Sequence, residues 1–168
     1  MVKSGYADCR GERKSMETIR LANMNDLSCC AELLGILFAQ EQEFNPDPAK
    51  QRNGLEMIIT NPDAGFVLVY EADGMVQGMV LVLFTVSTAL GSRVAILEDM
   101  IVAPELRGRG VGTRLREKAV QMAIDKGCAR ITLLTDHDNN AAHSFYRKGG
   151  FSRSDMVVFR RVIGCGSE

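Results

Sequence analysis

Between a predicted strand and a predicted helix lies the sequence Val102-Ala103-Pro104-Glu105-Leu106-Arg107-Gly108-Arg109-Gly110-Val111-Gly112-Thr113. Its three glycines let backbone N–H groups come close to a bound anion, and Arg107 and Arg109 add positive charge beside them. The first turn of a helix is partly positive as well, because its N–H groups have no partner inside the helix. The segment therefore predicts a phosphate-binding turn.

Other interpretations of these glycines fit less well. A P-loop is excluded because no Gly-Lys-Ser/Thr follows, so the lysine and the magnesium-binding hydroxyl are missing. A dinucleotide-binding turn is disfavoured by the Gly-x-Gly-x-Gly spacing and by Pro104 in the loop, although Asp136 follows the next strand. A plain solvent-exposed turn stays an alternative, although two arginines beside three glycines would be unusual there.

The segments on either side of the turn predict a strand–helix–strand unit. Before the turn, the apolar run Val94–Val102 predicts a strand. After it, apolar residues recur at helical spacing as far as Gly127, and Ala129–Thr135 predicts the next strand. Glu98 and Asp99 place two adjacent charges in the first strand, and charge inside an apolar strand requires an explanation.

A second informative segment is Asn139-Asn140-Ala141-Ala142-His143-Ser144-Phe145-Tyr146-Arg147-Lys148-Gly149-Gly150-Phe151. Asp138 or Asn139 can cap the helix within it. The glycine segment resembles the Arg/Gln-x-x-Gly-x-Gly/Ala pyrophosphate motif of the GNAT superfamily, and the second segment resembles the Asn-x-x-Ala-x-x-Phe/Leu-Tyr-x-x-x-Gly-Phe signature of the same superfamily. Two motifs in the right order make the chain similar to the acetyl-CoA-dependent N-acetyltransferases of that superfamily over residues 95–151.

The resemblance implies the fold class. We expect an α/β protein with a single GNAT domain over residues 16–163, whose twisted mixed β-sheet is splayed between the fourth and fifth strands and carries helices on both faces. Residues 1–15 are expected to be an N-terminal arm and residues 164–168 a C-terminal tail. Asp73-Gly74 predicts a tight turn between the second and third strands, and the linker between the first two helices is expected to border a substrate cleft. The predicted elements are strands 16–21, 65–71, 76–84, 94–102 and 129–135, helices from residue 23, 25 or 26 to about 43, 49–60, 111–126 and 139–149, and a last pair of strands within 151–163.

The resemblance also implies acetyl-CoA as co-substrate. It implies that the main chain at Ile101 and Val102 pairs with the pantetheine arm like an added strand, and that N–H groups near Met100 or Ile101 polarise the thioester carbonyl if the strand bulges there. It further implies that the glycine turn holds the pyrophosphate, while Asn139 and Tyr146 reach the pantetheine and thioester from one helix face. The candidate coenzyme-binding residues are Met100, Ile101, Val102, Arg107, Gly108, Arg109, Gly110, Val111, Gly112, Thr113, Asn139, Ala142 and Tyr146.

Acetyl transfer to an amine requires a base, because an amine with a pKa of about 10.4 is mostly protonated at neutral pH. Glu98 and Asp99 are the candidate bases, since adjacent carboxylates attract a cationic amine. On a flat strand they face opposite ways, so one of them is expected to act, with Glu98 the first choice. Tyr146 is the candidate acid for the leaving thiolate, and His137 and His143 are weaker candidates. The alternatives are carboxylates bonded to backbone and a tyrosine that packs in the core.

Composition and charge exclude several classes of protein. A formal net charge of -1 gives no electrostatic basis for binding nucleic acid or an anionic membrane. No run of about 18 apolar residues and no signal-peptide pattern occurs, so we expect a soluble, cytoplasmic protein. The five cysteines are odd in number and scattered, and no cysteine or histidine spacing fits a metal site. Reduced thiols and no metal are therefore expected.

The acceptor is less constrained than the coenzyme. Glu98-Asp99 resembles the Glu-Asp pair of polyamine and amino-sugar acetyltransferases within the superfamily, so we expect a small primary amine ahead of a protein lysine or N-terminus. Relatives in this superfamily are often homodimers, which makes a homodimer a candidate assembly. A different class stays open as well: a sensor or assembly module that binds acetyl-CoA without turnover, for which the pyrophosphate turn alone would suffice.

Overall fold

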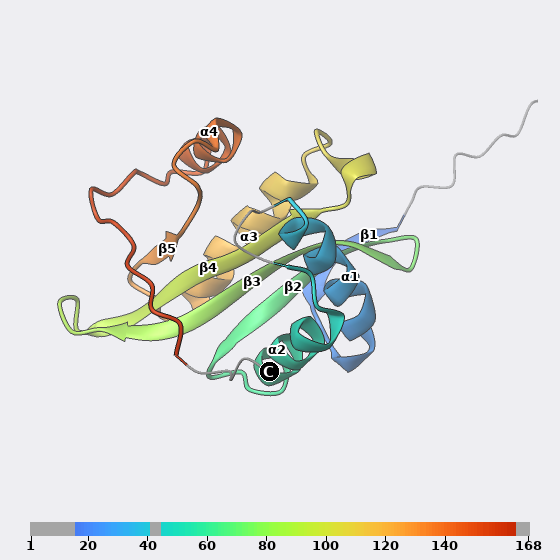
Figure 1. Cartoon of the computed structure of the whole chain (residues 1–168), viewed down its shortest axis with the longest axis horizontal. Helices are drawn as coiled ribbons and strands as arrows, with labels where there is room; N and C mark the ends of the chain where they lie inside the picture. The colour runs from blue at the N-terminus through green and yellow to red at the C-terminus, as the bar shows by residue number, and fades with distance from the viewer. Residues whose placement is uncertain (1–15, 41–44, 164–168) are drawn as a thin grey trace, which may run out of the picture. The chain divides into compact units, whose positions relative to one another are not determined.

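The computed structural model describes residues 16–40 and 45–163 of the chain. The chain divides into two compact units, residues 1–134 and 135–168. The predicted arm 1–15 and tail 164–168 lie outside the described residues, and the predicted domain 16–163 stays a prediction. In the first unit (Figure 1) the elements are β1 (Glu17–Leu21), α1 (Leu27–Phe38), α2 (Pro48–Ile59), β2 (Gly65–Ala72), β3 (Met75–Ser87), β4 (Ser92–Val102), α3 (Val111–Asp125) and β5 (Ile131–Leu133).

The five strands described in the first unit form one mixed sheet in the order β1-β2-β3-β4-β5. Neighbours from β1 to β4 are antiparallel, and β5 runs parallel to β4 (Figure 1). The tight turn between β2 and β3 is the predicted one. Asp73 and Gly74 both have positive φ, at 51° and 78°, as a two-residue hairpin turn of type I′ requires. The mixed sheet and its helices confirm the predicted α/β fold class.

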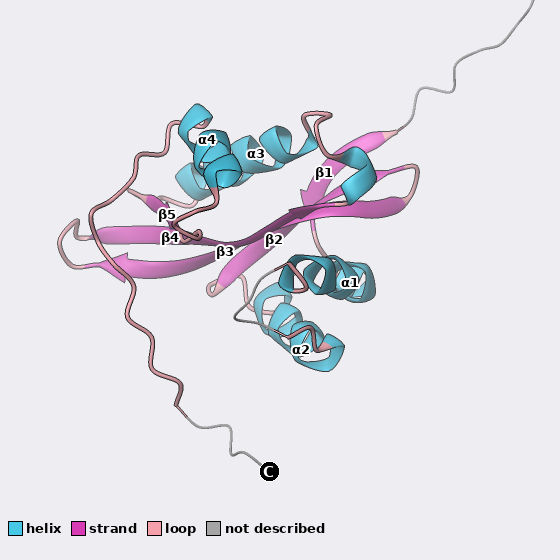
Figure 2. Ribbon diagram, turned by 45° about the horizontal axis from the view of Figure 1, so that its top comes forward, coloured by secondary structure: helices cyan, strands magenta, loops and turns pink. Residues whose placement is uncertain are grey.

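Helices cover both faces of this sheet. α1 and α2 lie on one face and α3 on the other (Figure 2). Side chains that alternate along the strands, such as Val69, Met79 and Leu81, are buried against Leu34 of α1 and Leu55 of α2. The intervening side chains face α3. The buried residues of α3 recur about once per helical turn and form a stripe. That stripe consists of Val111, Leu115, Ala119 and Ala123.

A charged cluster fixes the start of α1 against the sheet. Arg20 of β1 donates to both carboxylate oxygens of Asp26 (2.7 and 2.9 Å) and to Glu71 of β2 (2.8 Å). The Asn23 side chain accepts from the Asn25 N–H (2.9 Å), and Asp26 accepts from the Asn23 N–H (2.8 Å). Hydrogen bonding to Arg20 lowers the pKa of Asp26, although burial alone would raise it. The sequence offers Asn23, Asn25 or Asp26 as the cap at the start of this helix, and all three take part in this network.

Several elements differ from the prediction. α1 ends at Phe38 rather than near residue 43, and residues 41–43 lie outside the described residues. β5 covers Ile131–Leu133 rather than 129–135. The predicted last pair of strands within 151–163 is wrong, because residues 151–163 form no strand. A β-rich sequence forms a strand only where a neighbouring strand completes its hydrogen bonds. The described residues 135–163 of the second unit contain no such strand.

The second unit contains one described helix, α4 (Asn140–Lys148). Asn139 caps it as predicted, because its side-chain oxygen accepts from the Ala142 N–H (3.0 Å). The chain leaves the helix through Gly150, whose φ is 84°. Within residues 16–40 and 45–163, every helix is too short or too polar to cross a membrane.

Candidate active site

A β-bulge in β4 sets the geometry of the two predicted carboxylates. Asp99 pairs with Leu81 of β3 and Leu97 pairs with Val82, the next residue, so Glu98 is the extra residue between them. A bulge of this kind bends the strand and re-aims its side chains. Glu98 and Asp99 consequently line the same cavity. The expectation that a flat strand would point them to opposite faces is therefore wrong.

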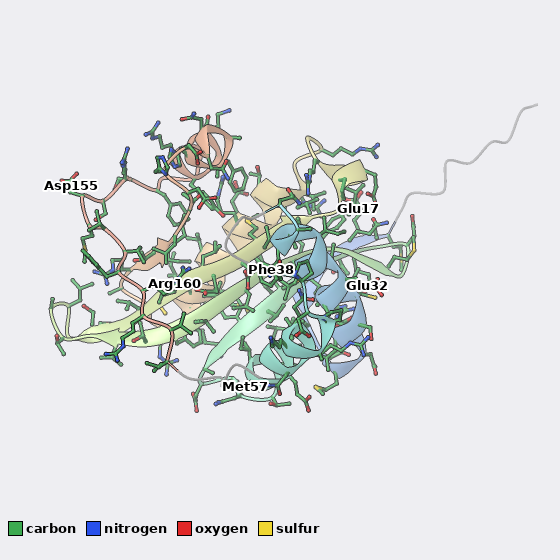
Figure 3. All side chains as sticks on the ribbon, in the orientation of Figure 1. Glu17, Glu32, Phe38, Met57, Asp155 and Arg160 are labelled. Carbon is green, nitrogen blue, oxygen red and sulfur yellow. The ribbon has the colours of Figure 1, made fainter. Side chains whose placement is uncertain are left out.

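The cavity lies on the α1/α2 face of the sheet and has a volume of about 320 Å³. This volume is near the lower end of the range for small-molecule sites. Phe38, labelled in Figure 3, contributes to its wall from the end of α1. The two carboxylates thus border a mostly apolar wall, where attraction to a cation is screened less than in open water. The described apolar lining consists of Leu34, Phe38, Leu55, Ile58, Leu81 and Leu83.

Asp47 and Lys50 bring two further charges to the cavity from the start of α2. Asp47 caps this helix by accepting from the N–H groups of Ala49 (3.1 Å) and Lys50 (3.2 Å). The hydrogen bond from the Lys50 N–H lowers the pKa of Asp47, and Lys50 Nζ lies 3.3 Å from Asp47 Oδ2. Among the described lining residues, three carboxylates therefore stand against one ammonium, which gives the cavity a negative potential.

The sheet is splayed between the fourth and fifth strands, as predicted. β5 pairs with Ala95–Leu97 and ends there, whereas β4 continues to Val102. We refer to Glu98–Val102 as the β4 extension. It begins at the bulge, so the carboxylates lie where the two strands part.

Hydrogen bonding determines which main-chain groups of the β4 extension face away from β3. The Ala103 N–H donates to the Gln77 carbonyl (2.9 Å). In an antiparallel pair, the N–H and C=O groups of successive residues point alternately toward the partner strand and away from it. Those of Ile101 therefore point toward β3, and those of Met100 and Val102 point away from it. The predicted pantetheine contact therefore fits the main chain of Met100 and Val102 rather than that of Ile101.

The glycine turn, Arg107–Thr113, joins the end of β4 to α3. Gly108 and Gly110 have φ of 77° and 82°, in the left-handed region that other residues rarely adopt. A Cβ on either glycine would meet no described atom within 4 Å, so the space beside the turn is open. Arg107 Nε donates to the Val102 carbonyl (3.1 Å), which ties the turn to β4.

Three predicted coenzyme residues, Asn139, Ala142 and Tyr146, lie in the second unit. The Asn139 oxygen is used in the cap of α4. The Tyr146 ring makes edge-on contacts with the rings of Phe145 and Phe151, at centroid distances of 5.0 and 5.7 Å. These contacts place the ring in a small aromatic cluster, and the role of its hydroxyl stays a prediction.

The sequence matches the acetyltransferase (GNAT) family over residues 28–151. The chain belongs to this family. The uncharacterized N-acetyltransferase YhfO of Bacillus subtilis is 31% identical over 143 residues, which are 83% of this chain and 93% of that protein. Thialysine N-epsilon-acetyltransferase of Bos taurus is 37% identical over 75 residues, which are 45% of this chain and 44% of that protein.

Solved structures agree on the GNAT fold. An aminoglycoside N-acetyltransferase, AAC(6')-Iy, in complex with CoA superimposes with a TM-score of 0.76 at 23% identity, over 90% of this chain and 98% of that one. Membership of the GNAT family makes the protein an acetyl-CoA-dependent N-acetyltransferase, as its sequence predicts.

The glycine turn of this GNAT acetyltransferase fits the diphosphate of coenzyme A. Gly110 is the N-cap of α3, and no described side chain caps that helix. The N–H groups of Val111, Gly112 and Thr113 therefore begin α3 without a partner inside the helix. Such N–H groups bind phosphate oxygens, and the absence of side chains at Gly108 and Gly110 leaves the anion room to approach.

Part of the cavity lining could be found from sequence. Asn45 and Asp47 of the predicted cleft-forming linker do line the cavity. The lining residues within α1 and α2 were missed. A helix that packs on a sheet shows the same apolar stripe whether or not a cavity lies beneath it, so no sequence signal marks them.

Proposed function

We propose that this GNAT acetyltransferase acetylates a small primary amine that binds in the cavity on the α1/α2 face. The β4 bulge carries the proposal, because it brings Glu98 and Asp99 to one cavity. An excess of carboxylates favours a cationic acceptor, and the apolar wall favours an acceptor with an apolar body. The similarity to a thialysine N-epsilon-acetyltransferase supports the same class of acceptor.

Glu98 is the proposed general base, and Asp99 adds negative charge that holds the ammonium group of the acceptor. Glu98 accepts a proton from the amine, whose nitrogen then attacks the carbonyl carbon of the thioester. Acetyl-CoA supplies the acetyl group in activated form. The Met100 N–H, which follows the bulge and points away from β3, is the proposed donor to the thioester oxygen. Tyr146 is the proposed donor of a proton to the sulfur when the C–S bond breaks.

The proposed coenzyme site combines main-chain and side-chain groups. The glycine turn Arg107–Thr113 holds the diphosphate, and the main chain of Met100 and Val102 pairs with the pantetheine arm. Asn139, Ala142 and Tyr146 are assigned to the pantetheine and thioester end by their positions in the family signature.

Release of free thiol from acetyl-CoA tests the proposal. The panel contains polyamines, amino sugars, aminoglycosides and lysine peptides, each assayed at equal concentration with the full chain. We expect the highest kcat/KM with a small amine. Faster acetylation of the lysine peptides would contradict the small-amine assignment. Binding of acetyl-CoA in calorimetry without thiol release from any acceptor would favour the sensor alternative.

A further inference from the structure

Gln51 is a buried amide whose hydrogen bonds are unused. It lies in α2, is 7% exposed and lines the cavity on the α1/α2 face. Neither its Oε1 nor its Nε2 has a hydrogen-bond partner among the described residues. A buried polar atom without a partner costs free energy, and native proteins leave few of them. A ligand in the cavity is the natural source of the missing partners.

The described neighbours of Gln51 do not offer those partners. Leu55, one turn further along α2, and Leu34 of α1 are apolar and line the same cavity. Oε1 lies 4.0 Å from the position that a Cβ would take on Gly35 of α1, so a glycine leaves room beside the carboxamide. The amide of Gln51 therefore lies in an apolar wall between the two helices, facing a cavity that also contains the proposed base.

The two atoms of the amide require different partners. Oε1 accepts hydrogen bonds, whereas Nε2 donates them. If the group of the acceptor that binds Gln51 were a second ammonium, it could only donate hydrogen bonds; if it were a carboxylate, it could only accept them. Asp47, one turn before Gln51, is already paired with Lys50. A neutral hydroxyl or amide group both donates and accepts, so it satisfies Gln51 completely.

We infer that the acceptor carries a neutral hydroxyl or amide group that binds Gln51, separated by an apolar segment from the amine that is acetylated. The inference rests on the proposed function, and it makes Gln51 a specificity-determining residue. Within the small amines, it favours hydroxylated or amide-bearing amines over polyamines.

A matched series of straight-chain primary amines tests this inference. Amines of equal length end in a hydroxyl, an amide, an ammonium, a carboxylate or a methyl group, and several lengths are compared by thiol release. For the length that fits, we expect kcat/KM with the hydroxyl or amide to exceed that with the methyl or ammonium terminus about tenfold or more, because a buried amide rejects ligands that leave it unpaired. The hydroxyl and amide arms then show which of the two groups is preferred.

Two variants of Gln51 test whether this residue causes the preference for a hydroxyl or amide terminus. Gln51→Met removes both hydrogen bonds, so the ratio of kcat/KM between the preferred amine and the methyl-terminated amine should fall about tenfold. Gln51→Glu keeps only acceptor oxygens and adds charge, so the preference should shift toward the ammonium-terminated amine. Gln121→Met is the matched control, since Gln121 is exposed on α3, on the other face of the sheet, and the ratio should not change.

Three outcomes would overturn the inference, each in a different way. Equal kcat/KM for all termini, with clear turnover, would remove the role of Gln51 and leave the proposed function intact. A lower Tm of Gln51→Met with an unchanged ratio would show a structural role instead, because replacing an unpaired amide by an apolar side chain of similar volume should not destabilise the fold. Absence of thiol release with every amine, despite coenzyme binding, would refute the proposed function itself.

Discussion

The glycine turn and the cavity on the α1/α2 face of this GNAT acetyltransferase are built in different ways. The turn is one continuous run, Arg107–Thr113, that presents main-chain N–H groups at the start of α3. The cavity collects side chains from α1, α2, β3, β4 and the linker before α2. Main-chain recognition depends on backbone conformation and tolerates few residues at Gly108 and Gly110. Side-chain recognition can change one residue at a time while the sheet is kept. In the proposed function, the turn therefore binds the acetyl donor and the cavity selects the acceptor.

The largest expected effect is a loss of coenzyme binding when the glycine turn is changed. Gly110→Asp should weaken binding of acetyl-CoA by at least about 100-fold, because it places a side chain and a negative charge against the phosphates. Calorimetry measures this loss. Gly127→Asp is the matched control: Gly127 also has positive φ (77°), at the other end of α3, so the backbone strain is similar while coenzyme affinity should be kept. Retained affinity in Gly110→Asp would place the diphosphate elsewhere.

Removal of the proposed base should slow catalysis and leave coenzyme binding at the turn unchanged. Glu98→Gln should lower kcat about 100-fold at neutral pH and leave the Kd of acetyl-CoA unchanged. The deficit should shrink as the pH rises toward about 10, because the free amine then loses its proton without a base. A pH–rate profile checks both points, with Asp99→Asn as the comparison variant. A larger loss in Asp99→Asn than in Glu98→Gln would reverse the assignment.

A smaller effect is expected from the hydroxyl group of Tyr146. Tyr146→Phe should lower kcat about tenfold with nearly unchanged coenzyme affinity, because the leaving thiolate loses its proton donor. The ring contacts with Phe145 and Phe151 remain in this variant, so the fold should be preserved. Steady-state kinetics with the best acceptor measures the change. An unchanged kcat would leave Tyr146 with a packing role alone.

The last change concerns stability rather than catalysis: Asp26 fixes the start of α1, which forms part of the cavity wall. Asp26→Asn should lower the free energy of unfolding by about 2 kcal/mol, because it weakens a partly buried pair with Arg20. The folded-state pKa of Asp26 is depressed, so its contribution is present above about pH 4 and is lost as the pH falls further. Urea unfolding at several pH values measures it. Asp63→Asn, at an exposed carboxylate, should change stability by less than about 0.5 kcal/mol, and an equal loss there would refute the role of the Arg20 pair.

The same contrast explains what could be predicted from sequence. The glycine turn, the Asp73-Gly74 hairpin and the Asn139 cap are local, since a few consecutive residues determine the backbone. The bulge at Glu98 depends on the residues of β3 that lie opposite, and the cavity depends on how α1 and α2 pack. Gln51 carries no signal of its own, because an amide in a helix reads as a surface residue until burial is known. Strands were wrongly predicted within residues 151–163 for the same reason: a strand requires a neighbouring strand, which the sequence pattern does not reveal.

Because of the bulge, Glu98 is an extra residue in β4 that has no partner in the register with β3. Leu97 and Asp99 keep their partners on either side of it, so deleting Glu98 would leave every other side chain of β4 on its present face. Deleting a paired residue would instead turn one end of the strand over. A single codon can therefore add or remove the carboxylate, and the protein can gain or lose its proposed proton acceptor without rebuilding the strand that holds it.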